Sequence, residues 1–338
     1  MRRAACAGED RHHFMGMGQR YTVDPERIRA NHRRNVIHAG LLVAAMTLLL
    51  ATVGFLIAGV AGLVWIGLFS AVTLYFGPLM SQRLMLQFFS ASELRRNQVP
   101  LLYDTVDELC QRADIAQRPK LFYVPSRLML AFTVGGRDEV SIALSDGLLR
   151  RLTGREIAGV LAHELSHVAN GDLKLMALAD FMTKVTRTLA LLAMVLVLLN
   201  LPAIAEGEVL VPWPPILLLA LAPMVSLLLQ LGLSRAREYD ADAGAAMMTG
   251  DPEGVATALQ KMDSQQQRYW ETLLGRQGAV DQPSILRTHP RTSERVQRLA
   301  ELARPDEEPD WPHGDTPLPP DYGNVERKPR RRFHGFRY

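Results

Sequence analysis

Cysteine is scarce in this chain of 338 residues, which has only Cys6 and Cys110, far apart in the sequence. Two such cysteines cannot build a disulfide framework, so the soluble parts are expected in a reducing compartment. Lysine is also rare: only five of the 38 basic residues are lysines, and the arginines are spread along the whole chain. With a net charge of only +3, this distribution lacks the basic stripe of a nucleic-acid-binding protein, and no nucleic-acid partner is expected.

Charged residues are missing from one long stretch of the chain. No Asp, Glu, Lys or Arg occurs between Arg34 and Arg83. A transmembrane helix needs about 20 apolar residues, so this stretch is long enough for two spans. The glycines at 59–62 predict a turn between them. Buried core helices are the alternative interpretation of such a stretch, although its length makes that interpretation hard to sustain.

A second apolar region covers residues 185–234 and is interrupted by Glu206 and Glu208. It predicts two further spans, of which the fourth is expected to be irregular because four prolines fall within 212–223. Four spans is the preferred interpretation, and two spans is the alternative. The lipid bilayer is thus an expected partner.

The basic residues predict the orientation of these spans. Eight arginines precede residue 36, whereas the first predicted turn has no charge and the second has only glutamates. Since cytoplasmic loops are enriched in Lys and Arg, both turns should face away from the cytoplasm. We therefore expect a multi-pass protein of the cell (inner) membrane, with both termini and the soluble domain in the cytoplasm.

The soluble residues combine helices with a few strands. A helix is expected near 99–113, and residues 235–303 are expected to be helical. Three short apolar runs bounded by Pro, Ser and Gly predict a small sheet with strands at Lys120–Val124, Met129–Val134 and Val140–Leu144.

The clearest chemical motif is His-Glu-Leu-Ser-His at residues 163–167. On a helix, His163 and His167 lie on one face and can both bind one metal ion. Zinc suits this motif because it accepts nitrogen and oxygen ligands and keeps a position open for water. Glu164 lies one residue around the helix, where it can reach that water rather than the metal.

The residues before the motif support a helix at this position. Thr153 and Glu156 have the spacing of a capping box, which marks a helix N-terminus. Asn170 and Asp172 follow the motif. We prefer to interpret both as helix-end caps, with contacts to a ligand histidine as the alternative.

Two acidic residues farther along the chain are candidates for completing the metal site. Glu238 and Asp242 are four residues apart and share a face if their segment is helical. Glu238 could supply a third ligand, and Asp242 could hold the second ring nitrogen of a ligand histidine. A solvated acidic face paired with neighbouring arginines remains an equally good interpretation of their spacing alone.

Several sequence blocks occur in a recognisable order. They are RPKLFYVPSRLMLAFTVGG, EVSIALSDGLLRRLTGREIAGVLAHELSHVANGD, SRAREYDADAGA and THPRTSERVQRL. With the two apolar hairpins, they resemble the HtpX-like membrane zinc metallopeptidases, relatives of the CAAX prenyl protease, over about residues 30–300.

This resemblance implies a set of site residues. It assigns one zinc ion per chain to His163, His167 and Glu238, makes Glu164 the catalytic base, and places Asp242 behind the ligands. His289 matches a family histidine that contacts substrate or the developing oxyanion. The substrate-binding strand carries Leu130, Ala131 and Phe132 where the family usually has Asn-Ala, so the loss of the Asn side chain puts the specificity of substrate binding in question.

We therefore expect a mainly α integral membrane protein with four transmembrane helices in two hairpins. Its cytoplasmic metalloprotease domain is expected to be α+β and zincin-like, with a small sheet. The expected parts are a cytoplasmic N-terminal segment (1–35), a first hairpin (36–82), a first catalytic part (83–184), a second hairpin (185–234), a second catalytic part (235–303) and a disordered tail (304–338).

The expected function is hydrolysis of peptide bonds in protein or peptide substrates by metal-activated water. Because Glu238 closely follows the fourth span, the site is expected near the membrane surface. This position favours misfolded membrane proteins as substrates, as the resemblance implies. The alternatives are a catalytically inactive zinc-binding scaffold, a four-span transporter and a hydrolase acting on a non-peptide bond. The transporter is disfavoured because few polar groups lie within the spans.

Overall fold

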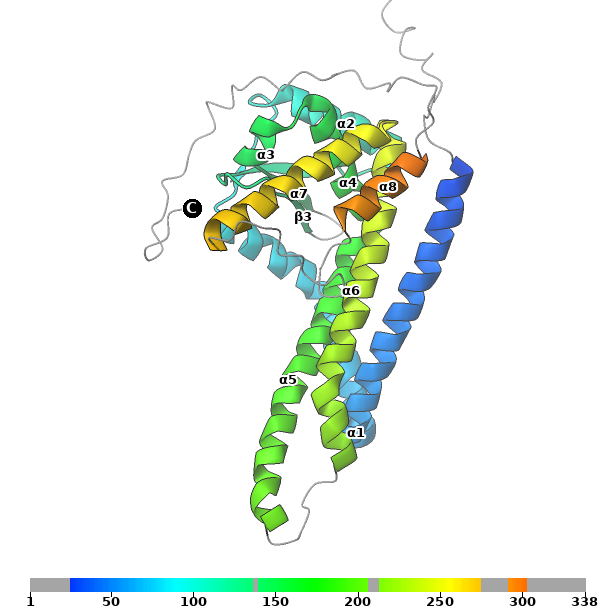
Figure 1. The fold of residues 1–338 in the computed structure, drawn as a ribbon, viewed down its shortest axis with the longest axis vertical. Coiled ribbons are helices and arrows are strands. Elements are labelled where there is room, and N and C mark those ends of the chain that lie inside the picture. The colour runs from blue at the N-terminus through cyan, green and yellow to red at the C-terminus, as the bar shows by residue number, and fades with distance from the viewer. Residues whose placement is uncertain (1–24, 136–138, 206–212, 275–290, 303–338) are drawn as a thin grey trace, which may run out of the picture.

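The computed structural model describes residues 25–135, 139–205, 213–274 and 291–302. Long helices run side by side along one end of the molecule, and a domain of shorter helices around a small sheet lies at the other end (Figure 1). The chain is thus mainly helical, as the apolar runs and helical spacing predict. The expected parts 1–35 and 304–338 lie wholly or largely outside the described residues.

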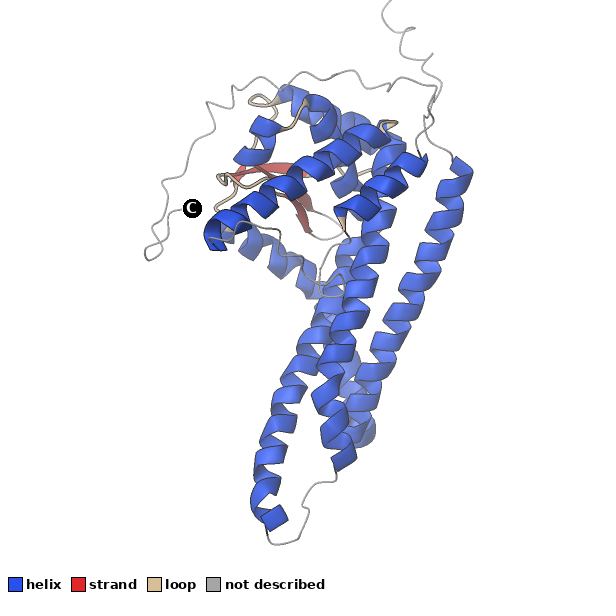
Figure 2. Ribbon diagram, viewed as in Figure 1, coloured by secondary structure: helices blue, strands red, loops and turns tan. Residues whose placement is uncertain are grey.

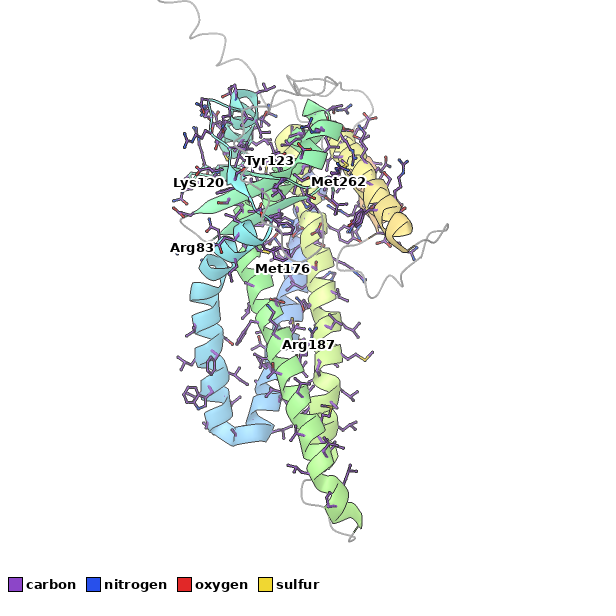
Figure 3. The ribbon with its side chains drawn as sticks, turned by 90° about the vertical axis from the view of Figure 1, so that its left-hand side faces the viewer. Arg83, Lys120, Tyr123, Met176, Arg187 and Met262 are labelled. Carbon is purple, nitrogen blue, oxygen red and sulfur yellow. The ribbon has the colours of Figure 1, made fainter. Side chains whose placement is uncertain are left out.

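The first apolar stretch forms a helical hairpin, as predicted. Helix α1 (Pro25–Phe88) contains a break at Ala58 and Gly59, and Gly59 has a φ of 57°. This left-handed conformation favours glycine because it has no side chain to collide with the backbone. The chain reverses at this break, so that the two halves of α1 lie against each other (Figure 3). Gly54 and Gly62 meet across the hairpin, where a Cβ on Gly62 would collide with the Gly54 carbonyl.

The second apolar region forms α5 (Asp172–Ala205) and α6 (Trp213–Thr249). Both helices pack against each other and against α1. The expected irregularity of the fourth span is not observed, because α6 remains helical through Pro223. Helix α6 continues beyond its apolar half into the domain, so one rigid element links the apolar bundle to the residues around Glu238.

Within the described residues, two helical segments are long and apolar enough to cross a membrane, Asn35–Leu56 and Ile216–Thr249. A shorter apolar helical segment covers Ala58–Val72. Many large apolar side chains on α1, α5 and α6 are exposed, including Leu48 and Trp65 of α1 and Met224 of α6. Extensive exposed apolar surface of this kind is typical of contact with lipid or with another protein.

A four-stranded mixed sheet lies inside the domain (Figure 2). Its strands are β1 (Ser92–Glu93), β2 (Lys120–Val124), β3 (Ala131–Gly135) and β4 (Val140–Ser145), in the order β1-β2-β4-β3. Strands β2 and β4 are parallel, and the other two pairings are antiparallel. The three predicted strands are confirmed to within two residues at each end. Strand β3 forms one edge of the sheet.

Five further helices complete the domain. They are α2 (Pro100–Arg112), α3 (Asp146–Arg151), α4 (Gly154–Ala169), α7 (Pro252–Leu274) and α8 (Thr292–Leu302). Helix α2 confirms the helix expected near 99–113. It carries Cys110 in the core, where burial raises the pKa of the thiol to about 11. A cysteine with so high a pKa is inert at neutral pH and serves packing.

Helix α4 begins at the predicted capping box. The Thr153 backbone N–H donates to Glu156 Oε2 at 2.9 Å, and the Glu156 N–H donates to Thr153 Oγ1 at 3.4 Å. Leu161 and Leu165 of α4 are fully buried in the main core, and each such side chain stabilises the fold by about 1.5–3 kcal/mol. Helix α4 packs against α2, α6 and α7, which fixes its polar face toward α6.

Candidate active site

Helices α4 and α6 bring the three expected metal ligands together. One donor atom from each of His163, His167 and Glu238 lies within 4.8 Å of the others. The two histidine Nε2 atoms are 3.3 Å apart, and His163 Nε2 lies 3.6 Å from Glu238 Oε2. The His167 Nε2 atom lies 3.9 Å from Glu238 Oε1. Folding thus brings Glu238 to the two histidines, from which it is at least 71 positions away in the sequence.

The cluster fits a zinc ion in size and in chemistry. Two ligand atoms bound at about 2.0–2.1 Å to a tetrahedral centre lie about 3.3 Å apart, close to the observed spacings. Two imidazoles and one carboxylate also form a known donor set of catalytic zinc sites, in which the fourth position remains open. The residues present therefore suit zinc.

Each histidine is oriented by a carboxylate on its other ring nitrogen. His163 Nδ1 lies 3.1 Å from Asp242 Oδ1, and His167 Nδ1 lies 2.8 Å from Asp172 Oδ2. Such contacts hold the Nδ1 proton and leave Nε2 as the free donor atom. Asp242 is buried against His163 rather than solvated. The preference for a cap is correct for Asn170, which is the C-cap of α4. It is wrong for Asp172, because this carboxylate points back to His167.

Two buried arginines in turn hold these carboxylates. Arg295 of α8 donates two hydrogen bonds to Asp242, at 2.6 and 2.7 Å, and its Nη1 lies 3.2 Å from Glu238 Oε2. Arg237 of α6 donates from Nε to Asp172 Oδ1 at 2.5 Å. Neither arginine was among the predicted site residues.

These charges alter the proton affinity of the buried groups. Burial lowers the pKa of His167, but the hydrogen bond to Asp172 and the charges of Glu164 and Glu238 outweigh burial, so that this pKa is raised. Burial also disfavours the charged form of Arg295, yet Asp242 raises its pKa above the ordinary value. Arg295 is therefore permanently charged beside the two acidic groups.

Glu164 lies next to the cluster and contacts the sheet. Its Oε2 accepts a hydrogen bond of 2.7 Å from Thr133 Oγ1 on β3. Thr133 was not among the predicted site residues. Its position directly after Leu130-Ala131-Phe132 offered a weak signal, since side chains alternate along a strand and every second one faces the same side.

The predicted substrate strand lies at the edge of the sheet. Leu130 exchanges backbone and side-chain hydrogen bonds with Ser145, and Ala131 packs against the main core. The Phe132 ring lies 5.0 Å from the ring of Phe89, just after α1. The structure thus places these three residues near Thr133. His289 lies outside the described residues.

A cavity of about 420 Å³ opens beside the cluster. Thr133, Glu164, His167 and Glu238 line one part of it. Apolar side chains of α5 and α6 line the other part, namely Leu173, Met176, Leu227 and Leu231. Figure 3 shows Met176 at the junction between the domain and the long helices. Glu164 and two of the three candidate metal ligands, His167 and Glu238, therefore face the same cavity.

Helix α4 carries two histidines and a glutamate, a neighbouring helix adds a carboxylate, and an edge strand lies beside them. This arrangement is typical of a metalloprotease. The chain matches Peptidase family M48 over residues 97–303, more than half of its length, and it belongs to this family.

Curated relatives agree with this assignment. The chain is 31% identical to a protein named Protease HtpX homolog from Burkholderia ambifaria strain MC40-6, over 80% of this chain and 98% of the relative. It is 32% identical to a protein of the same name from Burkholderia cenocepacia strain HI2424, with the same coverage. The crystal structure of S. mikatae Ste24p is similar with a TM-score of 0.47 and 17% identity, over 82% of this chain and 67% of that one. The family match and the HtpX homologues make the chain a metalloprotease of family M48, and its two long apolar helical segments support association with a membrane.

Proposed function

We propose that this protein is a zinc-dependent endopeptidase of the inner membrane that cleaves misfolded membrane proteins. The observation that carries the proposal is the position of Glu164. Its carboxylate lies on the same helix as two histidines whose Nε2 atoms are 3.3 Å apart, and it faces the same cavity as His167 and Glu238. This is the geometry required of a general base beside a metal-ligand cluster.

The proposed roles follow from the contacts of each residue. His163, His167 and Glu238 would hold the zinc ion, and Asp242 and Asp172 keep the imidazole rings turned toward it. Zinc, when bound, supplies a Lewis acid that polarises a carbonyl group and acidifies water. The hydrogen bond from Thr133 orients the Glu164 carboxylate through Oε2, and we expect Oε1 to accept the proton.

Glu164 moves one proton in two steps. It takes the proton from the water that attacks the carbonyl carbon, and it delivers this proton to the nitrogen as the carbon–nitrogen bond breaks. The products are a carboxyl group and an amino group. We propose that His289 donates a further hydrogen bond to the carbonyl oxygen as negative charge develops there.

Strand β3 is the proposed substrate-binding element. An extended peptide can pair with the backbone of an edge strand, and the pockets beside it select alternate side chains. The start of this edge carries Leu130, Ala131 and Phe132. The next residue, Thr133, donates a hydrogen bond to Glu164. A peptide aligned there would lie next to the catalytic carboxylate.

The membrane arrangement is proposed to include four spans. The two halves of α1, together with α5 and α6, form the apolar bundle, and their exposed apolar side chains would face lipid. The arginines around both hairpins favour a cytoplasmic domain and cytoplasmic termini. Because α6 carries Glu238 and runs directly out of the bundle, the active site would lie near the membrane surface, where loops of damaged membrane proteins are accessible.

The test is proteolysis by purified Glu164→Gln, which removes the basic group but preserves the shape of the side chain. We expect cleavage of an unfolded membrane-protein substrate to fall by at least about 100-fold, while bound zinc is retained. The matched control is Glu93→Gln, the same change at an exposed glutamate on the opposite edge of the sheet, which should retain wild-type activity. Unchanged proteolysis in Glu164→Gln would disprove the proposed mechanism.

A further inference from the structure

Asn35 is a buried polar residue on the long N-terminal helix. It lies at the start of the apolar segment Asn35–Leu56 and is only 6% exposed. Its amide Nδ2 donates a hydrogen bond of 2.7 Å to Asp240 Oδ1 on α6, a residue 205 positions away. A buried amide is costly unless it is paired, so this contact fixes α1 against α6 at one height.

The contact of Asn35 continues through buried charged groups to a proposed zinc ligand. The other oxygen of Asp240 accepts a hydrogen bond of 2.8 Å from Arg237 Nη1. Arg237 Nε donates to Asp172 Oδ1 at 2.5 Å, and Asp172 Oδ2 lies 2.8 Å from His167 Nδ1. Asp240, Arg237 and Asp172 are each 5% exposed or less. The path therefore lies in the interior, where water screens these interactions little.

Asn35 helps to set how Arg237 is placed between two carboxylates. One guanidinium, Arg237, is shared between the carboxylates of Asp172 and Asp240. The amide of Asn35 satisfies one oxygen of Asp240 without adding charge, which lets Arg237 direct its Nε–H to Asp172. Without this amide, the Asp240 carboxylate would no longer be held through Oδ1, and its contact with Arg237 Nη1 would shift. Asp172 would then be held less firmly behind His167.

We propose that Asn35 is a positioning residue for the metal centre, acting on His167 through Asp240, Arg237 and Asp172. The N-terminal half of α1 is then a supporting part of the active site as well as a membrane helix. This inference rests on the proposed zinc-binding function. The rival explanation is that Asn35 only holds α1 against α6, in which case its loss would change stability but not the metal centre.

The experiment compares Asn35→Leu with wild type in the full detergent-purified chain. Leu has a similar volume and suits a buried site, but it cannot donate to Asp240. Zinc affinity is measured by competition with a chelator, and the ligand geometry by the visible absorption of the Co²⁺-substituted protein. Changing a residue that directly supports a ligand costs about 10–100-fold in metal affinity. We expect a loss of about 3–10-fold for the more distant Asn35, with an altered Co²⁺ spectrum.

Two further variants sharpen the result. His38→Leu is the matched control, because His38 lies on the same helix but is exposed, and it should leave affinity and spectrum unchanged. Asn35→Ala tests the same loss of the amide if the leucine variant does not fold. In an Arg237→Met background, Asn35→Leu should cause little further loss of zinc affinity, since the path is already broken.

The outcomes separate the inference from the function on which it rests. Wild-type zinc affinity and an unchanged Co²⁺ spectrum in the folded Asn35 variants would overturn the positioning role, even if their unfolding midpoints fall. If wild type itself binds no zinc, the proposed function fails and the inference fails with it. Weakened zinc binding with an altered spectrum, absent from His38→Leu, supports the inference.

Discussion

Buried charges of opposite sign surround the proposed ligands. Arg295 reaches from α8 to Asp242 and Glu238, and Arg237 reaches Asp172. A buried ion pair adds little net stability, but removal of one partner leaves a charge without compensation in a medium of low dielectric constant. The arginines therefore compensate the charges of three acidic residues, Asp172, Glu238 and Asp242, that lie close to the two histidines.

Among substitutions of these buried charged residues, Arg295→Met is the most informative. It leaves Asp242 buried without its two hydrogen bonds, so we expect the free energy of unfolding to fall by about 3–5 kcal/mol. Denaturant unfolding of the detergent-solubilised protein measures the change. Arg298→Met is the control, because Arg298 lies on the same helix but is exposed over the ring of Tyr239, where a cation–π contact contributes only about 0.5–1 kcal/mol. Equal stability of the two variants would show that Arg295 does not compensate Asp242.

Helical spacing predicted His163 and His167, and the family resemblance added Glu238 and Asp242, but Arg295 and Thr133, which only folding brings to the site, were missed. His163 and His167 are one helical turn apart, and the motif alone places them on one face. Arg295 is 53 positions from Asp242, and Thr133 is 31 positions from Glu164. No local pattern relates such pairs. Asp172 was predicted to be a helix-end cap because it follows the motif helix closely. The chain turns at Gly171, which has a φ of 70°, and the Asp172 carboxylate contacts His167 instead.

Among the helices, the α1 hairpin depends on glycine. The two halves of α1 approach so closely that Gly62 faces the backbone of Gly54, and the reversal itself requires the positive φ of Gly59. The apolar length and the glycines were sufficient to predict this hairpin. In contrast, β1 was not predicted because two residues give no alternation to detect. The prediction that prolines make the fourth span irregular was wrong. Helix α6 packs against α1 and α5 and remains helical through Pro223.

The close contact in the hairpin can be tested with Gly62→Ala. The added methyl group would collide with the Gly54 carbonyl, so we expect a loss of about 1–3 kcal/mol in stability, seen as a lower thermal midpoint. Gly67→Ala is the matched control, because nothing lies within 4 Å of the position of its Cβ. That control should be neutral or slightly stabilising, since alanine favours a helix more than glycine does. A Gly62→Ala protein as stable as the control would contradict the close approach.

For the whole molecule, the continuity of α6 connects the apolar bundle with the site. The helix leaves the bundle, supplies Glu238 and then Asp242, and packs on α4. The length of the uncharged apolar runs predicted the segments of this arrangement. It could not predict their packing, because the contacts between α1, α5 and α6 depend on which apolar faces meet.

The proposed topology predicts which side of the membrane each part faces. Single cysteines are introduced by Ala61→Cys, in the first turn, or Arg118→Cys, in the domain, after Cys6 and Cys110 are replaced by serine. Both positions are exposed. An impermeant maleimide applied to spheroplasts should label the Ala61→Cys protein, while the Arg118→Cys protein should react only after the membrane is opened. Labelling of the Arg118→Cys protein in intact spheroplasts would contradict the proposed orientation, because it would place the domain outside the cytoplasm.

The zinc content of the purified protein tests the central claim most directly. Metal analysis should find one zinc ion per chain in wild type. It should find almost none in Glu238→Ala, because the two histidines of α4 alone do not complete the ligand set. The control is Glu301→Ala, an exposed glutamate on α8, which should retain one zinc ion. A wild-type protein without zinc, or a Glu238→Ala protein with a full complement, would contradict the assignment of the His163, His167 and Glu238 metal centre.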